Sequence, residues 1–134
     1  MDLRATGATL PEVFTRIALG LFAAAVDPAT VVETDVREVR AHGGGVSALL
    51  QGWLQECLYV HEVEGFACRT IEFAVFDATP GAGGEALRLH AILKGEEIDP
   101  ARHQVRPIRN VLASELAPAG GPSGPFQARA TLDL

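Results

Sequence analysis

The segment from Phe126 to Leu134 constrains the fold more than any other part of this sequence. Apolar residues occupy every second position, and a polar or charged residue stands between each pair. Such strict alternation predicts a β-strand with one buried face and one exposed face. A strand of this kind belongs to a sheet that covers a core on one side only, as antiparallel sheets commonly do.

Two amphipathic helices are predicted before this strand. Thr9 can cap the first helix, whose apolar residues recur at steps of three and four until the helix ends near Asp27. The second helix opens near Ser47, after three consecutive glycines, and ends before Gly65. Cys57 falls on its apolar face, so we expect a small core residue there rather than a reactive thiol.

Further strands are predicted where β-branched and apolar residues gather between turn-forming segments. They are placed at residues 3–7, 31–40, 67–77, 85–94 and 105–115. Pro107 favours an edge position for the last of these. Between the strands, a hairpin loop is predicted at 78–84, a turn-rich segment at 95–103 and a Gly/Pro loop at 117–125.

The predicted order is strand, helix, strand, helix and then a run of strands, which is typical of an α+β fold. We expect residues 1–134 to form a single domain. In this domain a mixed or antiparallel sheet of about six strands would carry both helices on one face. The other face of the sheet would be partly solvated.

The charge balance limits the possible partners. A net charge of −6 argues against a protein that binds nucleic acid through charge alone. A local basic cluster is interpreted as a solvated face; it consists of Arg102, His103, Arg106 and Arg109. The start of the chain does not resemble a signal peptide, and the longest apolar run is too short to span a membrane. The cytoplasm is therefore the expected compartment.

Candidate catalytic groups are few. His42 and the three glycines after it resemble an esterase oxyanion-hole motif, but the sequence has no Gly-x-Ser-x-Gly elbow. The same glycines precede a helix and could bind an anion, yet no Gly-Lys-Ser/Thr follows for a nucleotide P-loop. A hydrolase that uses His42 or His61 with nearby acids stays an alternative, although no nucleophile is paired to a base. We therefore expect a protein that is not an enzyme.

The predicted last strand brings two anionic groups together. They are the side chain of Asp133 and the terminal carboxylate of Leu134. Adjacent carboxylates repel each other unless protons, cationic side chains or a hard cation compensate the charge. From the residues alone, both a cation site and a solvated strand end remain open.

Four segments of the chain are similar to motifs of one protein family. Residues 49–59 are similar to the family's Leu-Leu-x-x-Trp-Leu-x-Glu-Leu-Leu-Tyr, and residues 95–103 resemble its Gly-Glu-x-x-Asp-Pro-x-Arg-His. The helix opening at Thr9 is similar to Thr-x-x-Glu-Ala-Phe, and residues 132–134 are similar to the terminal Leu-Asp-Val/Ile. These matches follow one another in order along nearly the whole chain, which therefore resembles the archease family, the small activators of RtcB-type RNA-splicing ligases.

The resemblance implies an α+β protein that is not itself a ligase. Such a protein helps an RtcB-type RNA ligase become guanylylated and turn over during tRNA splicing and RNA repair. The resemblance also implies a divalent cation, Ca²⁺ or Mg²⁺, held by an N-terminal Asp, the penultimate Asp and the terminal carboxylate. The last two carry over to Asp133 and Leu134, and an anionic, all-oxygen site suits a hard cation. The implied partner is the ligase, with no strong direct binding to nucleic acid and no membrane.

Two segments depart from the family pattern. Aligning the family's opening His-x-Ala-Asp-Ile-x-Ile-x-Ala-x-Gly on Gly7 places the family Asp one residue before Met1. Either Asp2 takes this role through a shortened strand, or the ligand is lost, or the natural start lies upstream. The family's Lys-Ala-Val-Thr-Tyr-His corresponds to residues 109–114, where Arg109 replaces Lys and the Tyr and His are absent. The alternative function is a non-catalytic module of the same fold that binds a small molecule or a protein and has no ligase role.

Overall fold

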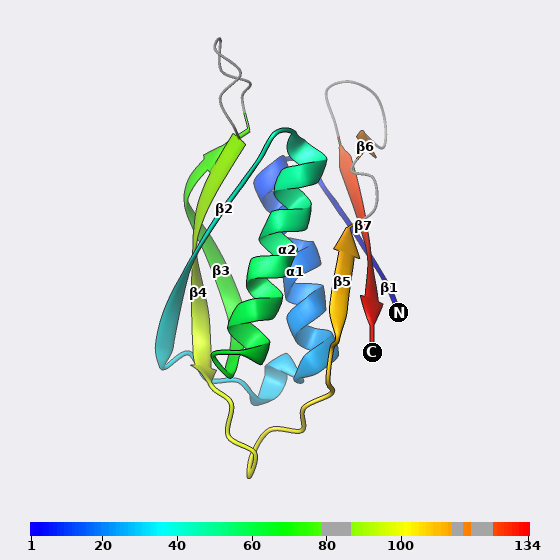
Figure 1. Ribbon diagram of the computed structural model, residues 1–134. Helices are drawn as coiled ribbons and strands as arrows, with labels where there is room; N and C mark the ends of the chain where they lie inside the picture. Colours follow the sequence, from blue (N-terminus) through cyan, green and yellow to red (C-terminus); the bar gives the residue numbers. More distant parts are fainter. Residues whose placement is uncertain (79–86, 114–116, 119–124) are drawn as a thin grey trace.

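Two helices form the middle layer of the molecule, with an antiparallel sheet on either side of them (Figure 1). This is a computed structural model that describes residues 1–78, 87–113, 117–118 and 125–134. Each sheet turns one face to the helices and the other to solvent. No helix in these ranges is long and apolar enough to cross a membrane.

The first sheet is built around the strand that the alternation predicted. Its four strands are β1 (Asp2–Gly7), β7 (Phe126–Asp133), β5 (Asn110–Ala113) and the short β6 (Ala117–Pro118). β7 lies between β1 and β5 and also pairs with β6, always antiparallel. Ala128, Ala130 and Leu132 are buried, and the residues between them are exposed, so the predicted one-sided strand is confirmed.

The second sheet has β4 at its centre. Its three strands are, in spatial order, β2 (Asp35–Gly43), β4 (Leu87–Glu97) and β3 (Phe66–Asp77). Near the end of β4 the backbones of β3 and β4 approach very closely. A Cβ atom added to Gly95 would lie 1.8 Å from the carbonyl oxygen of Ala67, so this position requires glycine.

The helices are α1 (Leu10–Ala25) and α2 (Val46–Glu62), and the 3₁₀ turn η1 (Pro28–Thr30) follows α1. The predicted cap of α1 is confirmed, since the hydroxyl of Thr9 accepts a hydrogen bond from the Glu12 N–H at 3.3 Å. Trp53 of α2 is fully buried and donates its indole N–H to the carbonyl of Phe14 in α1 at 3.0 Å. This bond ties the two helices together inside the core.

The α+β class is confirmed, but the expectation of one sheet with both helices on one face is wrong. The strands divide into two sheets, and α1 packs on strands of both. Alternation in a sequence shows that a strand has a buried face. It does not show which strands share a sheet and which lie opposite across the core.

Three predicted strands differ in extent from the observed ones. The strand predicted at 85–94 continues as β4 to Glu97, into the segment that was predicted to be turn-rich. The strand predicted at 31–40 begins only at Asp35, because η1 and the loop after it occupy the preceding residues. The strand predicted at 105–115 is reduced to β5, since the Arg106 N–H donates to the Ala25 carbonyl at 2.8 Å and Pro107 has no N–H to donate. Most of the hairpin loop predicted at 78–84 lies outside the described residues.

Candidate functional site

The two chain ends lie side by side in the first sheet (Figure 1). The N-terminal ammonium group of Met1 donates to the carbonyl of Leu132 at 3.0 Å, and the N–H of Leu132 donates to the carbonyl of Met1 at 2.7 Å. This register places Asp2 opposite Thr131. The Thr131 hydroxyl donates a hydrogen bond to the Asp2 carboxylate at 3.3 Å, so Asp2 is fixed against the last strand.

Asp133 is held on the other side of the same strand. It pairs with Asn110 of β5, and its carbonyl accepts a hydrogen bond from the Arg109 N–H at 2.6 Å. Because Asp133 stands two residues beyond the partner of Asp2, both carboxylates belong to the exposed face of the sheet. Such diagonal neighbours lie about 7–8 Å apart. Together with the exposed Leu134, they form what we call the carboxylate corner: Asp2, Asp133 and the terminal carboxylate of Leu134.

The donors at the carboxylate corner fit a hard cation. They are carboxylate oxygens, which Ca²⁺ and Mg²⁺ prefer as ligands. Within the described ranges, no three His, Cys, Asp or Glu side chains gather into a metal-binding group. For a cation at this corner, the terminal carboxylate of Leu134 would be a third protein donor beside the two side chains. Water or a partner protein would have to complete the roughly six to eight oxygen ligands that Ca²⁺ takes.

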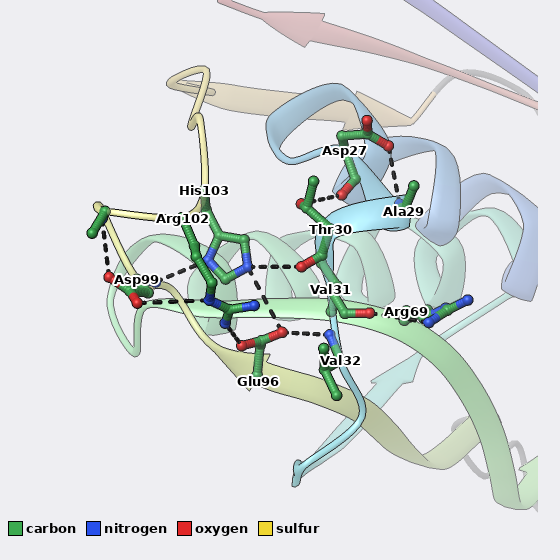
Figure 2. A network of polar contacts seen from close by, with 11 residues as sticks. Asp27, Ala29, Thr30, Val31, Val32, Arg69, Glu96, Asp99, Arg102 and His103 are labelled. Carbon is green, nitrogen blue, oxygen red and sulfur yellow. Dashed lines mark hydrogen bonds and ion pairs between the residues drawn. The ribbon is translucent and has the colours of Figure 1, made fainter.

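A second polar cluster is built by the turn that follows β4, and Figure 2 shows it from close by. The side chain of Glu96 is buried. Its carboxylate accepts hydrogen bonds from the Val32 N–H and from the guanidinium group of Arg102, and His103 Nε2 lies 3.7 Å away. The Val32 N–H, and after it Arg102, lower the pKa of Glu96. The ionised carboxylate therefore joins the segment before β2 to the end of β4.

His103 is held through both ring nitrogens. Its Nδ1 accepts a hydrogen bond from the Asp99 N–H at 2.9 Å, so the ring proton belongs to Nε2. Nε2 faces the carbonyl oxygen of Thr30 at 3.2 Å. His103 as a whole is only 4% exposed, and its side chain is fully buried. His103 is thus a structural link between the turn and η1 rather than a free base or metal ligand.

The interpretation of the basic cluster as a solvated face is wrong for His103, which is buried. Arg102, Arg106 and Arg109 are exposed as expected, although Arg102 also pairs with the buried Glu96. Sequence reasoning missed this network because it treated the cluster by charge alone. The feature that could have indicated it is Glu96 before the Asp99-Pro100 turn, with Arg102 and His103 directly after that turn.

The groups considered for a hydrolase do not form a nucleophile–base pair. Burial lowers the pKa of His61, and its Nδ1 lies 3.2 Å from the carbonyl of Phe66. His42 lies on the exposed face of β2. Burial raises the pKa of Cys68 to about 12 and that of Cys57 well above its usual range, so both thiols stay protonated. As expected from the sequence, Cys57 is a core residue.

Comparison with known proteins identifies the family. Residues 1–113 match the model of the Archease protein family (MTH1598/TM1083). The chain belongs to the archease family. This archease is 32% identical over 104 residues to protein archease of Pyrococcus abyssi, which covers 78% of the chain and 70% of that protein. It is 29% identical over 135 residues to protein archease of Thermococcus gammatolerans, covering 100% of the chain and 92% of that protein.

The fold of this archease also matches a solved structure. The solution structure of protein 1598 of Methanobacterium thermoautotrophicum superimposes with a TM-score of 0.77 at 26% identity, covering 99% of this chain and 91% of the other. The resemblance inferred from the motifs is therefore confirmed. The family match ends at residue 113, before Asp133 and Leu134, whereas the Thermococcus gammatolerans comparison extends over the whole chain. The role of the carboxylate corner stays a prediction.

Proposed function

We propose that this archease is a non-catalytic accessory protein that promotes the guanylylation and turnover of an RtcB-type RNA ligase in tRNA splicing and RNA repair. Membership of the archease family supports this role. The observation that carries the proposed mechanism is the pairing of the two chain ends, which puts Asp2 and Asp133 on one exposed face beside the terminal carboxylate.

The proposed cofactor is a divalent cation, Ca²⁺ or Mg²⁺, held by Asp133, the terminal carboxylate of Leu134 and Asp2. Three carboxylates at one corner repel one another, and a bound cation relieves that repulsion. Asp133 and Leu134 are exposed, so a ligase can reach them from solvent. The cation would supply positive charge and open ligand positions to oxygen atoms of the partner.

The test is the guanylylation of the ligase with GTP in the presence of substoichiometric archease. The decisive variant is Asp133→Asn, and the matched control is Glu72→Gln, which removes one negative charge from an exposed side chain of the other sheet. Wild type and the control should accelerate guanylylation and support many turnovers. Asp133→Asn should lose at least about tenfold of the acceleration, as expected when a metal ligand is weakened.

Two outcomes would contradict the proposal at different levels. If Asp133→Asn activates as well as wild type, the carboxylate corner has no part in the mechanism. If no version accelerates a ligase that responds to another archease, the accessory role itself is wrong. The chain would then be a binding module that has kept the fold without the ligase function.

A further inference from the structure

The exposed face of the second sheet carries a hollow of about 460 Å³ over β2 and β4. Two arginines and two histidines surround it. They form two neighbouring cross-strand pairs, so that the four residues stand at the corners of a square. Arg40 is paired with His90, and His42 is paired with Arg88. Alternate residues of a strand point to the same face, so all four lie on the side of the sheet away from the helices.

Neither arginine of this square, Arg40 or Arg88, forms a side-chain hydrogen bond or an ion pair with any residue that the structure describes. Carboxylates do lie nearby, since Glu38 Oε1 is 3.1 Å from His90 Nε2 and Asp77 is the cross-strand partner of Arg88. Neither of them lines the hollow. Among the described residues, every ionisable side chain on its wall is a base, in a chain whose net charge is −6.

Val75 of β3 is 43% exposed and gives the hollow an apolar side chain on one side. Ala41 and Leu89 also line it, but their side chains are buried on the helix side of the sheet. The volume falls within the range of about 300–1,000 Å³ that is usual for small-molecule sites. A few convergent polar groups are also typical of such sites. The dimensions favour a small ligand over a protein surface, which would need about 800 Å² on each partner.

We propose that this hollow, with Arg40, His42, Arg88 and His90 around it, binds a nucleoside phosphate. A guanidinium group presents parallel N–H donors that match phosphate oxygens, and no described residue occupies the donors of these two arginines. An imidazole offers a further N–H donor. Flat guanidinium and imidazole groups beside an exposed valine give a nucleobase a surface on which to stack. The ligand is either a free nucleotide or the phosphorylated end of an RNA strand.

The site is tested by following backbone amide NMR shifts during titration with guanosine 5′-monophosphate, inorganic phosphate and guanosine. The double variant Arg40→Gln/Arg88→Gln removes both guanidinium groups. Its matched control is Arg4→Gln/Arg129→Gln, which removes a cross-strand pair of exposed arginines from the other sheet. All four side chains are exposed, and equal thermal midpoints would verify that each variant is folded.

The nucleotide and inorganic phosphate should shift amides of β2 and β4 in wild type, with the nucleotide binding more tightly than either phosphate or guanosine alone. The Arg40/Arg88 variant should lose at least tenfold in affinity, and the control should stay within twofold of wild type. The proposal is overturned if both variants lose affinity equally, because the binding would then be non-specific charge attraction. It is also overturned if millimolar nucleotide binds nowhere, or if a Glu-rich peptide binds the hollow more tightly than the nucleotide.

A 5′-phosphorylated tetraribonucleotide separates the two sources of the ligand. If it binds at least tenfold more tightly than the mononucleotide, the site takes an RNA end. If it binds equally or less tightly, the site takes a free nucleotide. Either result supports the nucleoside-phosphate site, and neither depends on the role of the carboxylate corner.

Discussion

Glu96 and Arg102 form an ion pair across the turn that follows β4, and the same carboxylate accepts the Val32 N–H. Val32 lies 64 residues earlier in the chain, between η1 and β2. The neighbouring His103 faces the Thr30 carbonyl in that same segment. The turn after β4 therefore holds the segment that precedes β2 close to β4, which is the strand that pairs with β2 (Figure 2).

Replacing Glu96 by Ala should lower the thermal unfolding midpoint by several degrees. The Val32 N–H would lose its acceptor, and Arg102 would lose its counter-ion. The control is Glu97→Ala, because the Glu97 side chain is 77% exposed and lies 3.7 Å from Arg37. Exposed pairs of this kind contribute little. Circular dichroism melts with equal midpoints for both variants would show that the Glu96 network does not stabilise the fold.

Gly95 is predicted to be irreplaceable for a steric reason. In Gly95→Ala the new Cβ would meet the Ala67 carbonyl oxygen, so β3 and β4 would have to separate locally. Forced shifts of this kind cost about 1–3 kcal/mol. Gly44→Ala is the matched control, since its Cβ would have no atom within 4 Å, and it should change stability by less than about 0.5 kcal/mol. Urea unfolding measures both, and a Gly95→Ala protein as stable as the control would contradict the steric argument.

Helices and strands whose apolar residues recur at a regular spacing could be predicted from the sequence. Which strands belong to the same sheet could not be predicted. The three- and four-residue steps of α1 and the alternation of β7 each follow from one buried face. The division into two sheets depends on which strands lie opposite each other across the helices, and no local pattern carries that information. The segment from Val105 to Arg109 has strand-like composition but forms no strand, because the Arg106 N–H donates to the Ala25 carbonyl of α1 instead of to a neighbouring strand.

Local sequence is equally insufficient to predict the burial of single polar side chains. Glu96 and Glu97 are adjacent and chemically alike, yet Glu96 is buried in a network and Glu97 is mostly exposed. Only the pairing of β4 with its neighbours decides which one faces inward. Asp133 and Leu134 could be named from the sequence because they are neighbours in the alternating last strand, and their role as cation ligands stays a prediction. The hydrogen bond from Thr131 to Asp2 required the register of β1 against β7.

His61 should make the protein less stable in mildly acidic solution. Burial lowers its pKa below the ordinary value of 6.5, so the unfolded chain takes up a proton that the folded chain resists. The contribution of His61 is complete above about pH 6.5 and is lost as the pH falls through the lowered folded pKa. One such proton can give a slope of at most about 1.4 kcal/mol per pH unit.

The variant His61→Gln removes this titration, so its stability should fall less steeply over the same pH interval. His42→Gln serves as the control, because it replaces an exposed histidine of β2 by the same residue. Urea unfolding over a series of pH values gives the free energies of unfolding. A His61→Gln protein with the wild-type slope would place the acid sensitivity in another group.

Asp2 decides whether the carboxylate corner offers a cation two carboxylates or three. Calorimetric titration with CaCl₂ should give about tenfold weaker binding for Asp2→Asn and at least as large a loss for Asp133→Asn. Thr131→Val should give a smaller loss, because it removes the hydroxyl that positions Asp2 and leaves the carboxylate in place. Glu72→Gln, on the other sheet, should bind as wild type does. If Asp2→Asn binds Ca²⁺ with wild-type affinity, Asp2 is not a ligand, and the shortened strand does not replace the family's N-terminal Asp.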